Sequence, residues 1–163
     1  MKTAHRLQSL AKRNQRYTGL LPKFWRPSVT ASQQLDCKPI HWDLIARFTD
    51  GSATPEDLWD WMETGYTYSQ IMRLLAESGV EFTGEAMAAI GDQMDIYAPI
   101  VERWKRTGRV GFSGPELCVA KAAAHVMDAL IELDRFGIAE QAAIWSAEQM
   151  ARIRVLHGQG VAA

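Results

Sequence analysis

The chain has 163 residues, of which 47% are hydrophobic and 23% are charged. This composition is typical of one globular domain and excludes an intrinsically disordered protein. The net charge of −1 hides an asymmetry: residues 1–35 hold seven Lys and Arg and no acidic residue, whereas the other 128 residues hold 11 basic and 19 acidic residues. The two cysteines have no CxxC spacing, which excludes a cysteine-rich zinc site and a disulfide framework.

The basic segment, residues 1–35, is predicted to be an N-terminal arm outside the helical domain. Its Lys and Arg residues alternate with aromatic residues such as Tyr17 and Phe24. Basic groups pair with phosphates, and aromatic rings stack on unpaired bases. The candidate contacts for nucleic acid or for an acidic protein partner are Lys12, Arg13, Arg16, Lys23, Trp25 and Arg26. Docking of the arm on the acidic body of its own chain, or on a second copy, is a third alternative.

Two helices are predicted after the arm. Apolar residues three and four apart predict a helix that begins at Pro39, since proline suits the first turn of a helix. A second helix is predicted from Pro55 to Ser78, with Thr54 as its N-cap. Gly65 lies inside this second helix, so one continuous helix and two shorter helices both remain open.

A third helix follows Thr83. Its apolar residues recur every three or four positions, as Met87, Ile90, Met94, Tyr97, Val101 and Trp104. Pro99 lies within the helix and predicts a bend near Asp95, because proline removes one backbone hydrogen bond. The same apolar seam suits either the core of the chain or a second copy, so self-association is an alternative that stays open.

The glycine-rich stretch KRTGRVGFSGPEL, residues 105–117, raises the question of a phosphate-binding loop. It lacks the Lys-Ser/Thr pair of a P-loop, and no strand is predicted before it, which excludes that motif. The pattern instead predicts a helix junction in which Ser113 caps the next helix and Glu116 completes a capping box. An anion site near that helix N-terminus is predicted for the basic residues Lys105, Arg106 and Arg109.

The segment 114–136 is apolar on nearly every side and is predicted to be the long central helix of the bundle. Its polar residues form one narrow stripe, which comprises Lys121, His125, Asp128, Glu132 and Arg135. The stripe is predicted to face solvent. An enzyme site around His125, Asp128 and Glu132 is the least favoured alternative, because the sequence contains no Glu-x-x-His motif for a di-metal centre.

The predicted fold class is an all-α bundle of about five helices in a single domain over residues 36–157. The last helix is predicted from Ile138 to about Leu156, and residues 158–163 are predicted to be a frayed tail. No cofactor or metal motif is recognised, and catalysis is not predicted. The chain has no apolar run of membrane-spanning length and no signal-peptide core, so a soluble, cytoplasmic protein without a membrane partner is expected.

The stretches DGSATPEDL, residues 50–58, and RTGRVGFSGPEL, residues 106–117, occur in an order that resembles small uncharacterised helical proteins of proteobacterial phages and plasmids. The resemblance covers about residues 20–150 and rests on turn and cap residues. It implies an accessory role on a mobile element and carries over no catalytic residue. Together with the basic arm, it predicts a non-catalytic accessory or regulatory protein that binds nucleic acid. The alternative is a protein-interaction module or an inhibitor of a host system.

Overall fold

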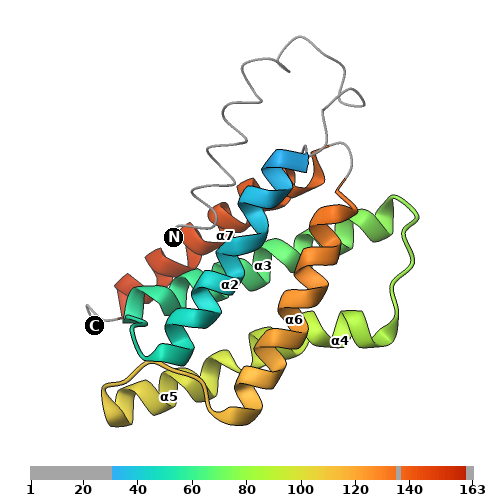
Figure 1. Cartoon of the computed structure of the whole chain (residues 1–163). Helices are drawn as coiled ribbons and strands as arrows, with labels where there is room; N and C mark the ends of the chain where they lie inside the picture. Colours follow the sequence, from blue (N-terminus) through green and yellow to red (C-terminus); the bar gives the residue numbers. More distant parts are fainter. Residues whose placement is uncertain (1–30, 135–136, 161–163) are drawn as a thin grey trace.

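The computed structural model describes the backbone of residues 31–134 and 137–160, and the side chains of residues 40–134 and 137–156. This part of the chain is a bundle of helices with no strand (Figure 1). The helices are α2 (Ala31–Asp50), α3 (Pro55–Glu77), α4 (Gly84–Asp95), α5 (Tyr97–Thr107), α6 (Gly114–Glu132) and α7 (Ile138–Gly160). The predicted all-α bundle is therefore confirmed.

Helix α3 occupies the centre of the bundle. It contacts all five other described helices, and its large side chains Trp61, Tyr68 and Ile71 are fully buried. Several polar residues of α3 are buried as well, and their hydroxyls bond within the helix: Thr64 donates to the Asp60 carbonyl at 2.7 Å. A helix that is buried on most sides is the core element of a small bundle.

Helix α6 differs from the prediction of a central helix at 114–136. It packs against α2 and α4, but it exposes Cys118, Ala122 and Ala129 to solvent. Alanine counts as apolar in a sequence pattern, yet its exposure to water costs little free energy, which explains why α6 is less buried than the pattern indicates. The helix also ends at Glu132, four residues earlier than predicted, with Leu133 as its C-cap.

The helix termini show where local sequence rules hold. Thr54 and Ser113 precede α3 and α6 as N-caps, as predicted. Each forms a capping box, which was predicted for Ser113 and not for Thr54. Helix α2 begins at Ala31 and not, as the sequence predicted, at Pro39. Pro39 therefore lies inside the helix, and the last five residues of the predicted arm belong to it. Proline favours the first turn but is tolerated inside a helix at the cost of one hydrogen bond.

The predicted bend near Asp95 corresponds to a break between two helices. Helix α4 ends at Asp95, and α5 begins at Tyr97, with Pro99 in its first turn. Ile96 serves as the C-cap of one helix and the N-cap of the next. Gly65, by contrast, does not interrupt α3, which is continuous from Pro55 to Glu77.

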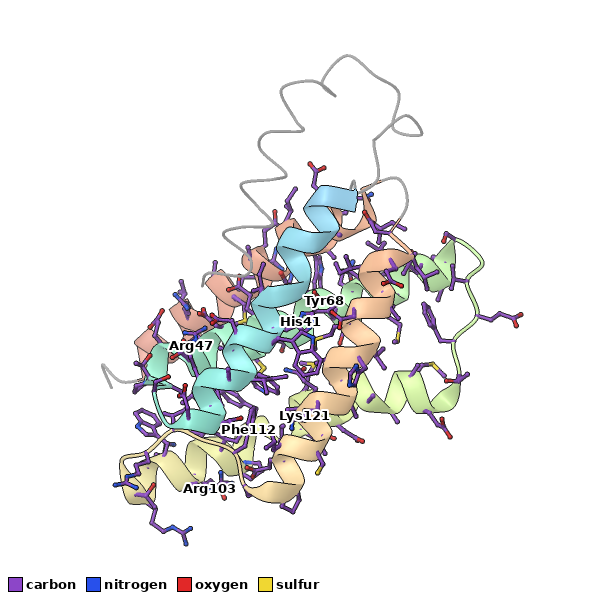
Figure 2. All side chains as sticks on the ribbon, in the orientation of Figure 1. His41, Arg47, Tyr68, Arg103, Phe112 and Lys121 are labelled. Carbon is purple, nitrogen blue, oxygen red and sulfur yellow. The ribbon has the colours of Figure 1, made fainter. Side chains whose placement is uncertain are left out.

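The apolar interior has two clusters. One joins α3, α4, α6 and α7 around Tyr68 and Ile71. The other joins α2, the start of α3, α5 and the start of α6 around Phe48 and Trp61. Figure 2 shows the side chains of His41 and Tyr68 pointing toward each other between these helices. The second cluster forms the base of the candidate site.

Candidate functional site

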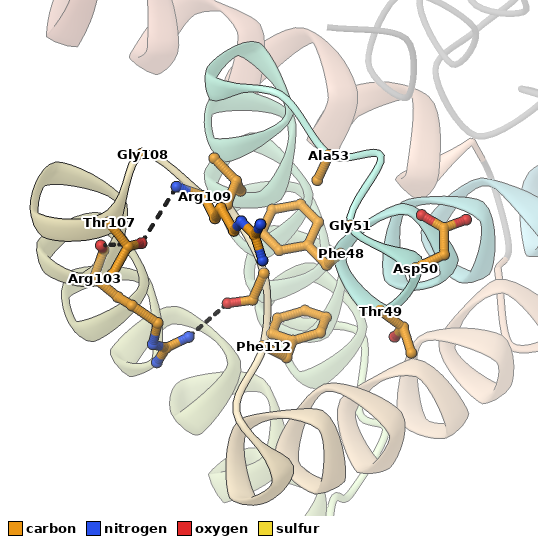
Figure 3. A pocket seen from close by; sticks show the side chains of 12 residues that line it. Phe48, Thr49, Asp50, Gly51, Ala53, Arg103, Thr107, Gly108, Arg109 and Phe112 are labelled. Atoms are coloured by element: carbon orange, nitrogen blue, oxygen red, sulfur yellow. Dashed lines mark hydrogen bonds between the residues drawn. The ribbon is translucent and has the colours of Figure 1, made fainter.

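A cleft of about 910 Å³ opens where the C-terminal ends of α2 and α5 meet the segment before α6 (Figure 3). Its wall comes from three stretches of chain: the end of α2 with the following loop, the last turns of α5, and residues 108–112. The lining residues are Phe48, Thr49, Asp50, Gly51, Ala53, Arg103, Thr107, Gly108, Arg109, Val110, Gly111 and Phe112.

Two stacked aromatic rings form the apolar part of this cleft. The ring centroids of Phe48 and Phe112 lie 4.8 Å apart at an interplanar angle of 26°, and Trp61 meets Phe112 edge-on at 5.1 Å. The Phe112 amide donates a hydrogen bond to the Phe48 carbonyl at 3.3 Å. A Cβ atom at Gly111 would lie 3.1 Å from that carbonyl oxygen, so glycine permits this close approach. Both apolar residues of this segment fold toward the bundle, since Val110 is buried and Phe112 is half-buried.

Most polar side chains of the cleft bond to their own chain. The Thr49 hydroxyl donates to the Ile45 carbonyl at 2.7 Å, and the Thr107 hydroxyl donates to the Arg103 carbonyl at 2.8 Å. The Asp50 carboxylate accepts a hydrogen bond from the Ser52 amide at 2.8 Å. Hydrogen bonds from the Ser52 side chain and from this amide lower the pKa of Asp50.

The guanidinium of Arg109 is the free cation of the cleft. Within the described ranges it has no hydrogen-bond or ion-pair partner, and the residue is exposed. Figure 3 shows its side chain extending over the cleft.

Glu116 occupies the N-terminus of α6. One carboxylate oxygen accepts a hydrogen bond from the Ser113 amide at 2.7 Å, and the other pairs with Arg103, which also donates to the Gly111 carbonyl. Burial alone would raise the pKa of Glu116, but the hydrogen bonds from Arg103 and Ser113 outweigh burial and hold the pKa below its ordinary value. The positive end of the helix dipole is therefore neutralised by a side chain of the same helix.

The predicted anion-site residues do not gather at that helix N-terminus. Arg109 lines the cleft, whereas Lys105 and Arg106 are exposed near the end of α5 and do not line it. The cation that pairs with Glu116 at this helix N-terminus is Arg103, which was not among the predicted residues. The six predicted contacts in the arm lie outside the described residues; they are Lys12, Arg13, Arg16, Lys23, Trp25 and Arg26.

A second polar group joins α2, α3 and α6 around Asp128. His41 Nε2 lies 3.0 Å from one carboxylate oxygen of Asp128, and Trp42 Nε1 donates to the other oxygen at 3.0 Å. The Tyr68 hydroxyl lies 3.4 Å from His41 Nδ1. Burial lowers the pKa of His41, and the nearby Asp128 only partly offsets this effect.

The predicted polar stripe of α6 is divided by these contacts. Asp128 is half-buried and accepts hydrogen bonds from two side chains of α2. The prediction of a solvent-facing stripe is therefore wrong at this residue. His125 is exposed and meets the Trp42 ring edge-on at 5.1 Å. Because His41 and Tyr68 are 0% and 1% exposed, the group around Asp128 connects α2, α3 and α6 inside the bundle. The sequence signal for it was His41 within the apolar stripe of α2.

The rest of the described chain adds two observations. Among residues with described side chains, no three or more His, Cys, Asp or Glu come together in a way that would hold a metal ion. No described helix combines the length and apolar character needed to cross a membrane.

Comparisons with protein-family models, curated proteins and solved structures found no match. The phage and plasmid resemblance therefore rests on residues 50–58 and 106–117 alone and stays a prediction.

Proposed function

We propose that this protein is a non-catalytic accessory protein that binds nucleic acid through the basic arm and a basic ridge on the bundle. The basic ridge comprises Lys105, Arg106 and Arg109. The observation that carries the proposal is that all three are exposed and, within the described residues, have no acidic partner. Four other arginines of the bundle are used internally in ion pairs: Arg47, Arg73, Arg103 and Arg154.

Charge distribution supports this proposal. The segment 1–35 carries seven basic residues and no acidic one, and the ridge adds three cations to a body that is otherwise acidic. Cations of this kind contact phosphates and release counterions, so they supply affinity without sequence selectivity. A regulatory role on a mobile element, which the resemblance implies, is compatible with such binding.

The test is fluorescence anisotropy with a labelled single strand and a labelled duplex, at salt concentrations from 50 to 200 mM. The wild-type affinity is expected to fall about a thousand-fold across this range, as for a protein with several phosphate contacts. Replacing the five basic arm contacts by Gln in the full chain, at Lys12, Arg13, Arg16, Lys23 and Arg26, is expected to abolish binding. An affinity that does not change with salt contradicts the proposal.

A protein-interaction role is the second candidate. The neighbouring residues Val155 and Leu156 on α7 are 59% and 68% exposed, and contact surfaces are marked by exposed apolar side chains that adjoin one another. Purification of the tagged protein from its host with and without nuclease separates the two functions. A single protein partner that remains after nuclease treatment, with no bound nucleic acid in either sample, favours the interaction role.

A further inference from the structure

We infer that the cleft holds one nucleotide of an unpaired strand, with the base against the Phe112 ring and the phosphate at Arg109. This inference rests on the proposed function, because the bound strand supplies the nucleotide. It adds the prediction that the protein distinguishes single-stranded from double-stranded nucleic acid.

The size and floor of the cleft suit a planar heterocycle. Its volume of about 910 Å³ is within the range of pockets that hold small molecules. Of the two stacked rings, Phe48 is the deeper one and is 2% exposed. Phe112 is half-buried and lines the cleft. The bond from the Phe112 amide to the Phe48 carbonyl fixes the stack before a ligand arrives. A base that stacks on such a ring must be unstacked from its own strand, since the neighbouring base pairs in a duplex cover both of its faces.

The charges of the cleft favour a single phosphate attached to an aromatic group. Arg109 is the available cation, and the Asp50 carboxylate keeps its negative charge although it accepts a hydrogen bond from the Ser52 amide. The cleft also lies at the C-terminal ends of α2 and α5, where the helix dipole is negative. A free multivalent anion is therefore disfavoured, and the affinity must come from stacking and one phosphate contact together. Lys105 and Arg106 are exposed on the preceding turn of α5 and suit the neighbouring phosphates of the strand.

The experiment measures the affinity of full-length variants for a labelled ten-residue oligothymidylate and for a labelled 20-bp duplex. Phe112→Leu keeps an apolar side chain but removes the aromatic face, and it is expected to weaken single-strand binding about five-fold or more. Duplex affinity is expected to stay within about two-fold. Arg109→Gln is expected to weaken single-strand binding. The matched control is Arg73→Gln, which removes an equal charge from α3 at a residue that does not line the cleft, and it is expected to have little effect.

Because Phe112 packs against Trp61, a second variant avoids the ring stack. Ala53 lines the cleft from the loop after α2 and is only half-buried, so Ala53→Gln narrows the cleft and is expected to weaken single-strand binding selectively. Inorganic phosphate at constant ionic strength is expected not to compete.

The outcomes separate the inference from the proposed function. Unchanged single-strand affinity in folded Phe112→Leu and Ala53→Gln, together with loss of binding in the arm variant, overturns the inference and leaves the proposed function intact. Absence of binding to either nucleic acid by the wild type at 50 mM salt overturns both. Equal weakening of single-strand and duplex binding by Ala53→Gln also overturns the inference.

Discussion

Trp61 and Gln93 exchange two hydrogen bonds where α3 crosses α4. The Trp61 indole N–H donates to the Gln93 carbonyl at 3.0 Å, and the Gln93 side-chain amide donates to the Trp61 carbonyl at 3.1 Å. Both side chains are fully buried. Gly65, one turn further along α3, has no side chain, and the Gln93 carboxamide lies directly against it.

Replacement of Gly65 by Ala is expected to destabilise the protein by about 1–3 kcal/mol. A Cβ atom there would lie 2.4 Å from Oε1 of Gln93 and 2.8 Å from Cγ of Met94. Gln93 would have to move and lose its bond to the Trp61 carbonyl. This cost exceeds the gain of about 1 kcal/mol from the higher helix propensity of alanine. Urea unfolding followed by circular dichroism gives the free energy of unfolding.

Gly91→Ala is the matched control for Gly65→Ala. Gly91 is an exposed residue inside α4, and a Cβ atom there meets no atom within 4 Å. Its replacement is expected to stabilise the protein by about 0.5–1 kcal/mol. Equal stability of the two variants would show that the helix crossing does not require glycine at position 65.

The stability of the protein is expected to fall as the pH decreases below about 6.5. The pKa of His41 is lowered in the folded state by burial, so the unfolded chain binds a proton at a pH where the folded chain does not. The stability contribution of neutral His41 is complete above the unfolded pKa and is lost as the pH falls toward the folded pKa. Thermal unfolding at pH 5.5 and pH 7.5 measures the effect.

The variant His41→Gln isolates this contribution from those of other groups. Glutamine does not titrate, so the difference in melting temperature between the variant and the wild type is expected to shrink at the lower pH. A constant difference at both pH values would mean that His41 does not set the pH dependence.

Replacement of Glu116 by Gln is expected to cost about 2 kcal/mol at pH 7, because hydrogen bonds to a charged group are stronger than those to a neutral one. The pKa of Glu116 is lowered in the folded state, so its contribution is present above the unfolded pKa and is lost as the pH falls through the folded pKa. The cost of the substitution should therefore decrease in acid. Urea unfolding at pH 7 and at a pH below the ordinary glutamate pKa of about 4.3 tests this, with Glu85→Gln in the first turn of α4 as an exposed control.

Replacement of Ala143 by Leu is expected to destabilise the bundle by about 1–3 kcal/mol through overpacking. Helix α7 meets α3 through small residues, and Ala142 and Ala143 have no exposed surface. The Thr67 and Ser146 hydroxyls hydrogen-bond between these two helices at 2.7 Å, which requires a close approach. Ala151→Leu on the exposed side of α7 is expected to change the stability little. A neutral result at Ala143 would show that α7 adjusts its position freely.

The helix caps could be predicted from the sequence because each depends on residues within one turn. Thr54 needs only Asp57, and Ser113 needs only Glu116. The central position of α3 could not be predicted in this way. Its buried polar residues, such as Thr64 and Thr67, donate hydrogen bonds to the backbone of their own helix. The pattern of polar and apolar residues in the sequence does not reveal these hydrogen bonds.

The contacts of the candidate sites depend on residues far apart in the chain. His41 and Asp128 are 87 positions apart, and Phe48 meets Phe112 only because α2 ends beside the segment that precedes α6. Neither pair has a local signature. The sequence identified Arg109 as a candidate cation but could not show that Arg103 would be neutralised by Glu116.

The carboxylate of Glu116 at the start of α6 also changes the meaning of the glycine-rich stretch 105–117. In a phosphate-binding loop, the backbone N–H groups of the helix N-terminus bind an anion from solution. Here the counter-ion is encoded in the polypeptide, three residues into the helix, and Arg103 completes its coordination. The folded chain therefore supplies its own anion at this helix N-terminus, in the form of the Glu116 carboxylate.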